Sequence, residues 1–286
     1  MRYIFEFIKY EGCGNDFILK DETEGAVTPD SDRSKLAKIL CHRHFQVGGD
    51  GILFIERAKG VDGSMRLFEP DGGEANMCGN GIRCIGSYLA EKLQKPEVDV
   101  LTRDGVKRIS RIGTEYRVQM GTVRTRRRDL DMYLVDKGES SDVLLDLPVR
   151  VDDRVMSASL VNTGEPHLVF ISDNVATVDV RCFGETINRD RTRFPRGMNV
   201  NFTQIIGLHE ISNRTYERGV FDETMACGTG ATASAAVSLL LNLVEPGPVK
   251  VTTLGGVITV DIDKDGNAQM TGPAKAVFKG ELSIEI

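Results

Sequence analysis

One motif occurs twice in this sequence, as MCGNG at residues 77–81 and as ACGTG at residues 226–230. The cysteines of the two copies, Cys78 and Cys227, are 149 residues apart. A spacing of 149 or 150 residues continues on both sides of the motif. It relates Gly14 to Gly164, Phe45 to Phe194, Gly48 to Gly197, Asp50 to Asn199, Pro96 to Pro246, Thr102 to Thr252, Gly105 to Gly255 and Met120 to Met270. One alignment therefore covers most of the chain and indicates two homologous halves.

The duplication predicts two domains, the first at residues 1–124 and the second at residues 125–271. At 286 residues the chain exceeds the usual size of a single domain, which supports this division. We expect the C-terminal tail, at about residues 272–286, to return to the first half. The arginine-rich stretch at residues 122–130 lies where the halves meet and is predicted to be a solvated linker.

Each half contains short alternating segments rich in β-branched residues and bounded by turn residues, a pattern typical of strands. They include residues 51–56, 98–101 and 257–262. Each half also contains one clear helix that begins after its motif cysteine. The first helix has apolar residues on one face, and the second, at 231–244, is apolar on every side. This pattern predicts an α+β fold in which each half is an antiparallel sheet curled around a central helix.

The motif places each cysteine immediately before a Gly-x-Gly sequence at the start of a helix. The first amides of a helix have no partner inside it and carry the positive end of the helix dipole, so they stabilise an anion beside them. We therefore expect a lowered pKa for Cys78 and Cys227, and we expect the glycine backbone to bind a carboxylate. A small apolar role is the usual explanation for a single buried cysteine, but the repeated context favours chemistry for this pair.

Two such cysteines, one from each half, suit the inversion of a stereocentre. A thiolate on one face of a carbon atom can remove its proton while a thiol on the opposite face returns one. In the reverse direction the two groups exchange roles. The motif therefore predicts a racemase or epimerase that inverts a carbon centre between the two cysteines, in the cleft between the halves.

The composition is that of an ordinary globular protein, with 41% hydrophobic and 27% charged residues and no tryptophan. A net charge of −6 and a pI near 5.4 argue against nucleic acid or an anionic membrane as the main partner. No apolar stretch of the sequence is long enough to span a bilayer, and no signal core begins it, so we expect a cytoplasmic protein. The six cysteines are scattered along the chain, which predicts reduced thiols instead of a secreted disulfide scaffold.

Three stretches of the chain carry a resemblance to a known family. They read KYEGCGNDF at residues 9–17, DGGEANMCGNGIRC at residues 71–84, and YERG at residues 216–219 followed by ACGTG at residues 226–230. In these stretches the chain resembles diaminopimelate epimerases, and the resemblance covers essentially its whole length. It implies two barrel-like domains, no pyridoxal phosphate or metal, and interconversion of LL- and meso-diaminopimelate for lysine and cell-wall synthesis.

The resemblance also implies roles for individual residues. Cys78 and Cys227 are implied to be the acid and the base. The residues implied to hold the reacting amino-acid end are Asn15, Gly79, Asn80, Gly228 and Thr229. The residues implied to hold the distal end are Asn199, Glu217 and Arg218. The distal roles make chemical sense, because a guanidinium fork binds a carboxylate and a glutamate accepts hydrogen bonds from an ammonium group.

The chain departs from the family pattern at two positions that would line the distal pocket. Glu69 stands where the family usually has asparagine, and Glu165 stands where it often has asparagine. Elsewhere, Glu11 and Cys13 replace the usual histidine and leucine of the first stretch. Two carboxylates in the pocket would favour a substrate that ends in a cation and disfavour a second carboxylate. The first alternative is therefore a racemase of the same mechanism that acts on another amino acid, such as one with a basic side chain.

A second alternative is a thiol-based redox protein or an amino-acid-binding protein that uses the duplicated cleft without turnover. It predicts no exchange of the substrate α-hydrogen with solvent. No metal site is expected at residues 41–44, where Cys-His-Arg-His lacks the paired spacing of zinc ligands. Cys84 is expected in the core, and His167 either lines the cleft or is structural. The expected partner is a small-molecule amino acid, and a homodimer is compatible with the sequence.

Overall fold

The computed structural model of the chain describes residues 2–25, 28–135, 142–151 and 154–285. It consists of two compact units, the first formed by Met1–Gln119 with Thr271–Ile286 and the second by Met120–Met270. The chain passes from the first unit to the second within β8 (Glu115–Thr122) and returns within β17 (Asn267–Pro273). The first unit thus ends inside a strand, before the predicted boundary that follows residue 124.

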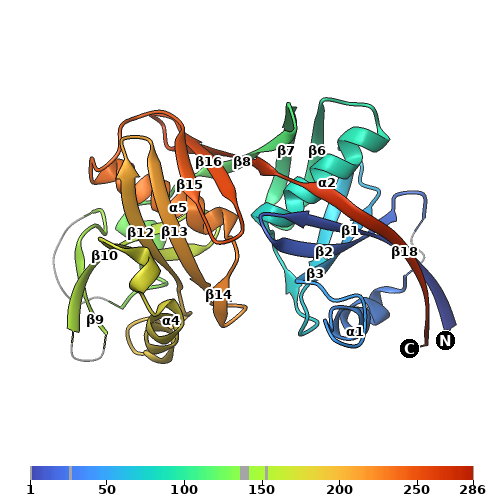
Figure 1. The fold of residues 1–286 in the computed structure, drawn as a ribbon, viewed down its shortest axis with the longest axis horizontal. Coiled ribbons are helices and arrows are strands. Elements are labelled where there is room, and N and C mark those ends of the chain that lie inside the picture. The colour runs from blue at the N-terminus through green and yellow to red at the C-terminus, as the bar shows by residue number, and fades with distance from the viewer. Residues whose placement is uncertain (1, 26–27, 136–141, 152–153, 286) are drawn as a thin grey trace. The chain divides into compact units, whose positions relative to one another are not determined.

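The first unit is a curled sheet around the helix α2 (Figure 1). Its elements besides β8 are β1 (Arg2–Gly12), β2 (Asn15–Glu22), α1 (Asp30–Leu40), β3 (Gly51–Glu56), β4 (Gly63–Phe68), β5 (Glu74–Ala75), α2 (Gly79–Lys92), β6 (Glu97–Thr102), β7 (Gly105–Ile112) and β18 (Lys275–Glu285). Strand pairing gives the order β18-β1-β2-β3-β4-β6-β7-β8. The helix α2 contacts β1, β2, β3, β4, β6 and β7, so the sheet surrounds it.

The second unit repeats this arrangement around the helix α5 (Figure 1). Its elements besides β17 are α3 (Arg127–Leu130), β9 (Leu147–Val151), β10 (Arg154–Asn162), β11 (Pro166–Ile171), the 3-10 turn η1 (Val175–Thr177), α4 (Val180–Arg189), β12 (Asn199–Gly207), β13 (Glu210–Glu217), β14 (Asp222–Thr224), α5 (Gly228–Leu240), β15 (Val249–Thr252) and β16 (Val257–Ile262). Strand pairing gives the order β9-β10-β11-β12-β13-β15-β16. The helix α5 contacts β10, β11, β12, β13, β15 and β16.

The two-domain α+β architecture agrees with the prediction, but the expected antiparallel pairing is wrong for part of each sheet. The pairs β2–β3 and β4–β6 are parallel, and so are the corresponding pairs β11–β12 and β13–β15. A parallel pair needs a crossover connection, and a helix is the usual one. The central helices α2 and α5 provide one crossover in each unit. The helices α1 and α4, which are not among the elements predicted from the sequence, provide the other.

The strand registers shift the alignment of the two halves by one residue at Asn199. In the first unit Phe17 of β2 lies opposite Gly51 of β3, and in the second His167 of β11 lies opposite Asn199 of β12. Asn199 therefore occupies the place of Gly51, one residue beyond Asp50, with which the sequence alignment paired it. The offset between the two halves therefore changes by one residue in the turn before β3 and β12, where an alignment gap is easily accommodated.

The predicted second helix begins and ends earlier than expected. It was placed at residues 231–244, whereas α5 runs from Gly228 to Leu240. Its end is set by Asn242, which has φ 56°, a left-handed conformation that asparagine tolerates and that stops a helix. The expected burial on every side is confirmed from Gly228 to Ser238, where every residue is buried, but Leu240 at the end of α5 is 41% exposed.

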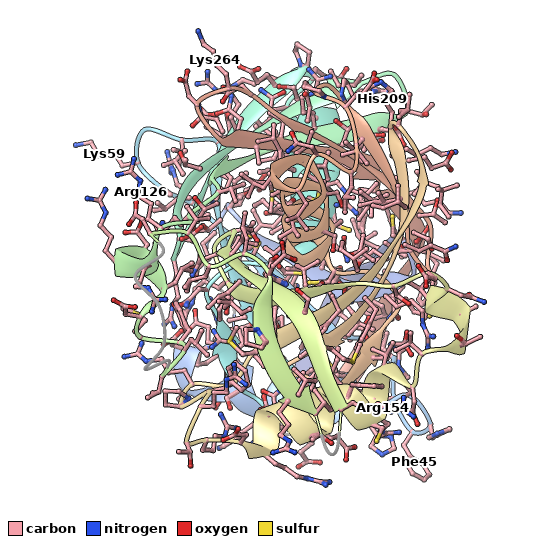
Figure 2. The ribbon with its side chains drawn as sticks, turned by 90° about the vertical axis from the view of Figure 1, so that its left-hand side faces the viewer. Phe45, Lys59, Arg126, Arg154, His209 and Lys264 are labelled. Atoms are coloured by element: carbon pink, nitrogen blue, oxygen red, sulfur yellow. The ribbon has the colours of Figure 1, made fainter. Side chains whose placement is uncertain are left out.

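The arginine-rich stretch is only in part the solvated linker that the sequence predicts. Its last four residues form the helix α3, and Leu130 at the end of α3 is fully buried in the core of the second unit. Arg124 also forms a β-bridge with Asn162. The expected exposure holds for Arg124, Arg126 and Arg128, and the Arg126 side chain projects from the surface in Figure 2. Among the described residues, no helix has the length and apolar character needed to cross a membrane.

Candidate active site

Cys78 is the N-cap of α2, with φ −135° and ψ 124°, so extended backbone turns into the helix at this residue. The backbone amide of Gly81 donates to its Sγ across 3.5 Å. A Cβ at Gly81 would lie 3.1 Å from Leu53, so the glycine lets this turn pack closely against β3. The sulfur thus lies at the positive end of a helix of 14 residues, where an anionic form is stabilised.

The Cys78 sulfur also lies against a series of carboxamides in the first unit. The thiol donates to Asn15 Oδ1 across 3.7 Å, and Asn80 Nδ2 donates to the same oxygen across 3.1 Å. Asn80 Oδ1 in turn accepts from the Arg83 guanidinium at 2.8 Å. The first unit therefore brings three of the predicted residues, Asn15, Cys78 and Asn80, into one hydrogen-bonded group.

Arg83 belongs to this group and was missed from the sequence. Its side chain is fully buried, and it also donates to the carbonyl oxygens of Pro273, at 3.2 Å, and Gly79, at 3.4 Å. A buried guanidinium needs acceptors on several sides, and here these include the first turn of α2. The signal in the sequence was an arginine within a helix whose pattern predicts burial.

Cys227 has the matching position in the second unit. It is the N-cap of α5, it is 5% exposed, and the amide of Gly230 donates to its Sγ across 3.4 Å. The hydroxyl of Thr229 lies 3.3 Å from the same sulfur. A hydroxyl can donate to a thiolate or accept from a thiol, so this contact serves either protonation state of Cys227.

The start of α5 is closely packed against polar groups of the sheet. A Cβ at Gly230 would lie 2.6 Å from Asn201 Oδ1 and 2.9 Å from Thr215 Oγ1, so only glycine fits there. The hydroxyl of Thr163 donates to the carbonyl oxygen of Thr229 at 3.0 Å. Thr163 and Asn201 therefore fix the segment that carries Cys227, and neither was singled out from the sequence.

Three of the predicted distal residues lie together in the second unit. The Arg218 guanidinium forms an ion pair with Glu165, and its other nitrogen donates to the carbonyl oxygen of Arg196 at 3.1 Å. The backbone amide of Arg218 donates to Asn199 Oδ1 at 3.0 Å. The side chains of Glu165 and Arg218 are 35% and 27% exposed, so the pair is open to solvent and to a ligand.

Glu69 and Glu217 occupy corresponding positions in the two units. Phe68 lies opposite Ile52 in the first unit as Tyr216 lies opposite Val200 in the second, and each glutamate follows its aromatic residue. Both glutamates are half-buried. The hydroxyl of Thr224 donates to Glu217 Oε1 at 2.6 Å. The duplication thus repeats a carboxylate at the end of β4 and of β13.

His167 is fully buried on β11, next to the distal group. Burial, and then the nearby Arg218 guanidinium, lower its pKa to about 3, so the imidazole is neutral near neutral pH. Its Nδ1 lies 3.0 Å from Asn201 Nδ2, and within the described part of the chain its Nε2 has no hydrogen-bond partner. Of the two roles left open from the sequence, the observed hydrogen bond to Asn201 favours the structural one.

The other cysteines differ from the motif pair in their surroundings. Cys84 is fully buried, and burial raises its pKa, which agrees with the predicted place in the core. Burial likewise raises the pKa of Cys13, and it raises that of Cys41 to about 12. Cys182 is exposed on α4. Across residues 2–25, 28–135, 142–151 and 154–285, no three His, Cys, Asp or Glu side chains gather as a metal site.

Comparison with known proteins places the chain in a family. The sequence profile of the family described as Diaminopimelate epimerase matches residues 7–126 and 159–277, which include both motif cysteines. The chain belongs to the diaminopimelate epimerase family. Relatives named diaminopimelate epimerase include one from Methanothrix thermoacetophila, 41% identical over 98% of this chain and 97% of that protein. Another, from Methanocella arvoryzae, is 37% identical with the same coverage.

Solved structures share the fold of this member of the diaminopimelate epimerase family at low sequence identity. A hydroxyproline epimerase from Agrobacterium vitis is 14% identical, with a TM-score of 0.71 over 99% of this chain and 92% of that one. A probable proline racemase from Agrobacterium radiobacter is also 14% identical, with a TM-score of 0.70 over 99% and 94%. At this identity the likeness concerns the fold of two units, each with a sheet around a helix.

Proposed function

We propose that this chain interconverts LL- and meso-diaminopimelate by inverting one Cα centre, with Cys78 and Cys227 as the acid and the base. The observation that carries the proposal is the matched setting of the two sulfurs. Each is the N-cap of a helix, and each accepts a hydrogen bond from the backbone amide three residues later. The names of the relatives support diaminopimelate as the substrate.

The reaction requires a proton to leave one face of Cα and another to arrive at the opposite face. One cysteine thiolate takes the Cα proton, and the electron pair of the broken C–H bond stays on the substrate, delocalised towards its carboxylate. The other cysteine thiol gives its proton to the opposite face and becomes the thiolate. The two sulfurs end with exchanged protonation states, so the reverse reaction uses the same groups in exchanged roles.

We infer that the reacting carboxylate of the substrate binds at the starts of α2 and α5. Backbone amides in the first turn of a helix have no acceptor inside the helix and favour an anion. The residues proposed for this end are Asn15, Gly79, Asn80, Gly228 and Thr229. The negative charge that develops beside this carboxylate during proton transfer is stabilised by the same amides.

We infer that Asn199, Glu217 and Arg218 hold the distal end of the substrate, together with Glu69 and Glu165. Arg218 can bind a distal carboxylate through its fork, and the glutamates can accept from a distal ammonium group. Because Arg218 already pairs with Glu165, a distal carboxylate has to compete with Glu165 for the guanidinium. Substrate selection in this chain therefore depends on that exchange.

The ion pair of Glu165 with Arg218 favours one other function, which is racemisation of an amino acid with a cationic side chain. Such a substrate would leave the pair of Glu165 and Arg218 intact. Its side-chain cation would then interact with the half-buried carboxylates of Glu69 and Glu217. The acid and base chemistry at the two cysteines would be unchanged.

A panel of substrates tests the two functions. The reduced protein is incubated without added cofactor with LL-diaminopimelate, L-lysine, L-ornithine and L-arginine, and the stereoisomers are separated by chiral chromatography. Formation of meso-diaminopimelate with the highest kcat/KM supports the first function. A higher kcat/KM for a cationic amino acid supports the second, and a folded, reduced protein that inverts none of these substrates contradicts both.

We further propose that the enzyme acts in the cytoplasm, on a small amino acid used for lysine and cell-wall precursors. A homodimer is compatible with this role, because each chain carries both cysteines of the proposed site. Gel filtration with light scattering determines the assembly.

A further inference from the structure

The carboxamide of Asn15 lies between a carboxylate and the Cys78 sulfur. Its Nδ2 donates to Asp50 Oδ2 at 2.5 Å, and its Oδ1 faces Cys78 Sγ at 3.7 Å and Asn80 Nδ2 at 3.1 Å. An ionised carboxylate can only accept hydrogen bonds. The NH2 group of Asn15 must therefore turn towards Asp50, which leaves its oxygen towards the sulfur.

The orientation of the neighbouring Asn80 carboxamide is fixed in the same way. The Arg83 guanidinium can only donate, and it donates to Asn80 Oδ1 at 2.8 Å. The NH2 group of Asn80 is then the donor to Asn15. A carboxylate at one end of this series and a guanidinium at the other thus polarise both amides in the same direction.

Asp50 is itself held by a compact group of charges. Its backbone amide donates to the carbonyl oxygen of Asp16 at 2.7 Å, and the Asp16 amide donates to Asp50 Oδ2 at 3.0 Å. Arg43 forms ion pairs of 2.6 Å with both aspartates, and Lys9 forms one of 2.6 Å with Asp16. Two carboxylates and two cations therefore balance each other, and Asp50 Oδ2 is directed at Asn15.

We propose that Asp50 is a positioning residue for the acid–base chemistry of Cys78 and acts through the Asn15 carboxamide. By holding the Asn15 oxygen towards the sulfur, Asp50 supplies an acceptor for the S–H group and favours the thiol over the thiolate. The free enzyme then favours the form in which Cys78 carries the proton, while the reverse reaction uses the form in which Cys78 is the thiolate. This role rests on the proposed function, which requires one cysteine to be a thiol while the other is a thiolate.

The test measures the thiolate character of Cys78 directly, in full-length reduced protein without substrate. The protein is treated with iodoacetamide over a range of pH, and the alkylation rate of each cysteine is followed by peptide mass spectrometry. In Asp50→Asn the Asn15 NH2 group loses its ionised acceptor, so only Asn80 still holds the Asn15 oxygen beside the sulfur. The acceptor for the S–H group is then held less firmly, which favours the thiolate. We expect the alkylation rate of Cys78 at about pH 7 to rise about threefold or more, with the exposed Cys182 unchanged.

A double-mutant cycle separates this role from a simple loss of negative charge. If Asp50 acts through Asn15, then Asp50→Asn raises the alkylation rate of Cys78 in the native background and has little further effect in Asn15→Ala. Asp16→Asn is the matched control, because it removes an equal charge from the same group of side chains. Among the described residues, it is the carboxylate of Asp50 and not that of Asp16 that accepts from the Asn15 side chain. We expect it to change the Cys78 rate by less than Asp50→Asn does.

Three results would overturn the proposal: an unchanged Cys78 rate in Asp50→Asn, an equal increase in the Asn15→Ala background, or an equal increase in Asp16→Asn. Should Asp50→Asn fail to give folded protein by circular dichroism, Asp50→Ser removes the same carboxylate and is read in the same way. Because no substrate is present, the outcome is independent of whether the enzyme epimerises diaminopimelate. The substrate panel tests that function separately.

Discussion

At the scale of single residues, the six thiols of this chain occupy sharply different surroundings. Cys78 and Cys227 each accept an amide hydrogen at a helix start, which supports a thiolate. Cys13, Cys41 and Cys84 are buried, and burial raises the pKa of each. The structure therefore separates two thiols suited to acid–base chemistry from three that pack in the core.

The first prediction concerns these two thiols. Cys78→Ser and Cys227→Ser should each lower kcat for epimerisation by at least about a hundredfold, because a hydroxyl of ordinary pKa is a poor base. The measurement is the rate of formation of the other stereoisomer by chiral chromatography. Cys182→Ser, at an exposed thiol on α4, is the control and should keep its activity. Near-normal turnover in either motif variant would rule out the two-cysteine mechanism.

The second prediction concerns the competition at Arg218. Glu165→Gln removes the carboxylate that pairs with this guanidinium and should lower KM for LL-diaminopimelate about tenfold, with a smaller change in kcat. Glu185→Gln is the matched control, because it removes a carboxylate paired with Arg189 on the surface of α4. Steady-state kinetics give both constants. A KM that rises or stays constant in Glu165→Gln would show that Glu165 does not oppose the substrate.

The third prediction follows from the neutral, buried His167, whose pKa burial lowers to about 3. An unfolded histidine has a pKa of about 6.5, so between these values the unfolded chain binds a proton that the folded protein excludes. The free energy of unfolding should therefore decrease as the pH falls below about 6.5. Between pH 7 and pH 5, the free energy of unfolding measured in urea should fall by about 1–2 kcal/mol less in His167→Gln than in the native protein. His209→Gln, at an exposed site, should follow the native protein, and equal losses in all three proteins would contradict this account.

At the scale of elements, the starts of α2 and α5 are fixed by contacts that leave little space. Gly81 packs against Leu53 of β3, and Gly230 packs against polar side chains of β12 and β13. Each helix then runs through the middle of its own sheet, so its first turn cannot shift without disturbing several strands. The position of each sulfur thus depends on the packing of a whole unit.

The fourth prediction tests this packing. In Gly230→Ala the new Cβ would lie 2.6 Å from Asn201 Oδ1 and 2.9 Å from Thr215 Oγ1, so the start of α5 must move. We expect the free energy of unfolding to fall by about 1–3 kcal/mol. In Gly219→Ala the new Cβ would meet no described heavy atom within 4 Å, and this control should unfold like the native protein. Equal stability of the two variants in urea unfolding would contradict the packing argument.

Elements with a strong local pattern could be predicted from the sequence, and those defined by partners could not. The alternating segment at residues 51–56 is β3, and the helix after Cys78 is α2. The direction of strand pairing depends on which strands meet across the sheet, so the parallel pairs were missed. The end of α5 was missed because alanine-rich and apolar sequence continues past the point where Asn242 takes a left-handed conformation.

At the scale of the whole molecule, the duplication seen in the sequence is repeated in the strand order and in the directions of pairing. In each unit an antiparallel pair is followed by a parallel pair, and the central helix follows the strand that comes next. The edge position that β9 takes in the second unit is taken in the first by β18, from the C-terminal end of the chain. The first unit therefore contains segments that lie far apart in sequence, whereas the second is one continuous stretch of the chain.

The candidate site could be predicted where a residue belongs to a repeated motif, as Cys78 and Cys227 do. Residues that act through a neighbour could not be found in this way. Arg83 and Thr163 support the motif segments by hydrogen bonds that only the folded chain creates. The link from Asp50 to Asn15 spans 35 residues of sequence and depends on the pairing of β2 with β3.

The central claim is that Cys78 and Cys227 exchange the α-hydrogen of diaminopimelate with solvent while inverting its stereocentre. The most direct measurement incubates the reduced protein with LL-diaminopimelate in deuterated water, without added cofactor, and follows α-deuterium by mass spectrometry together with the meso isomer. We expect deuterium to enter the α-position of the meso product as it forms, and we expect Cys78→Ser and Cys227→Ser to abolish formation of that product. A folded, reduced native protein that forms no meso isomer and incorporates no deuterium would rule out this mechanism.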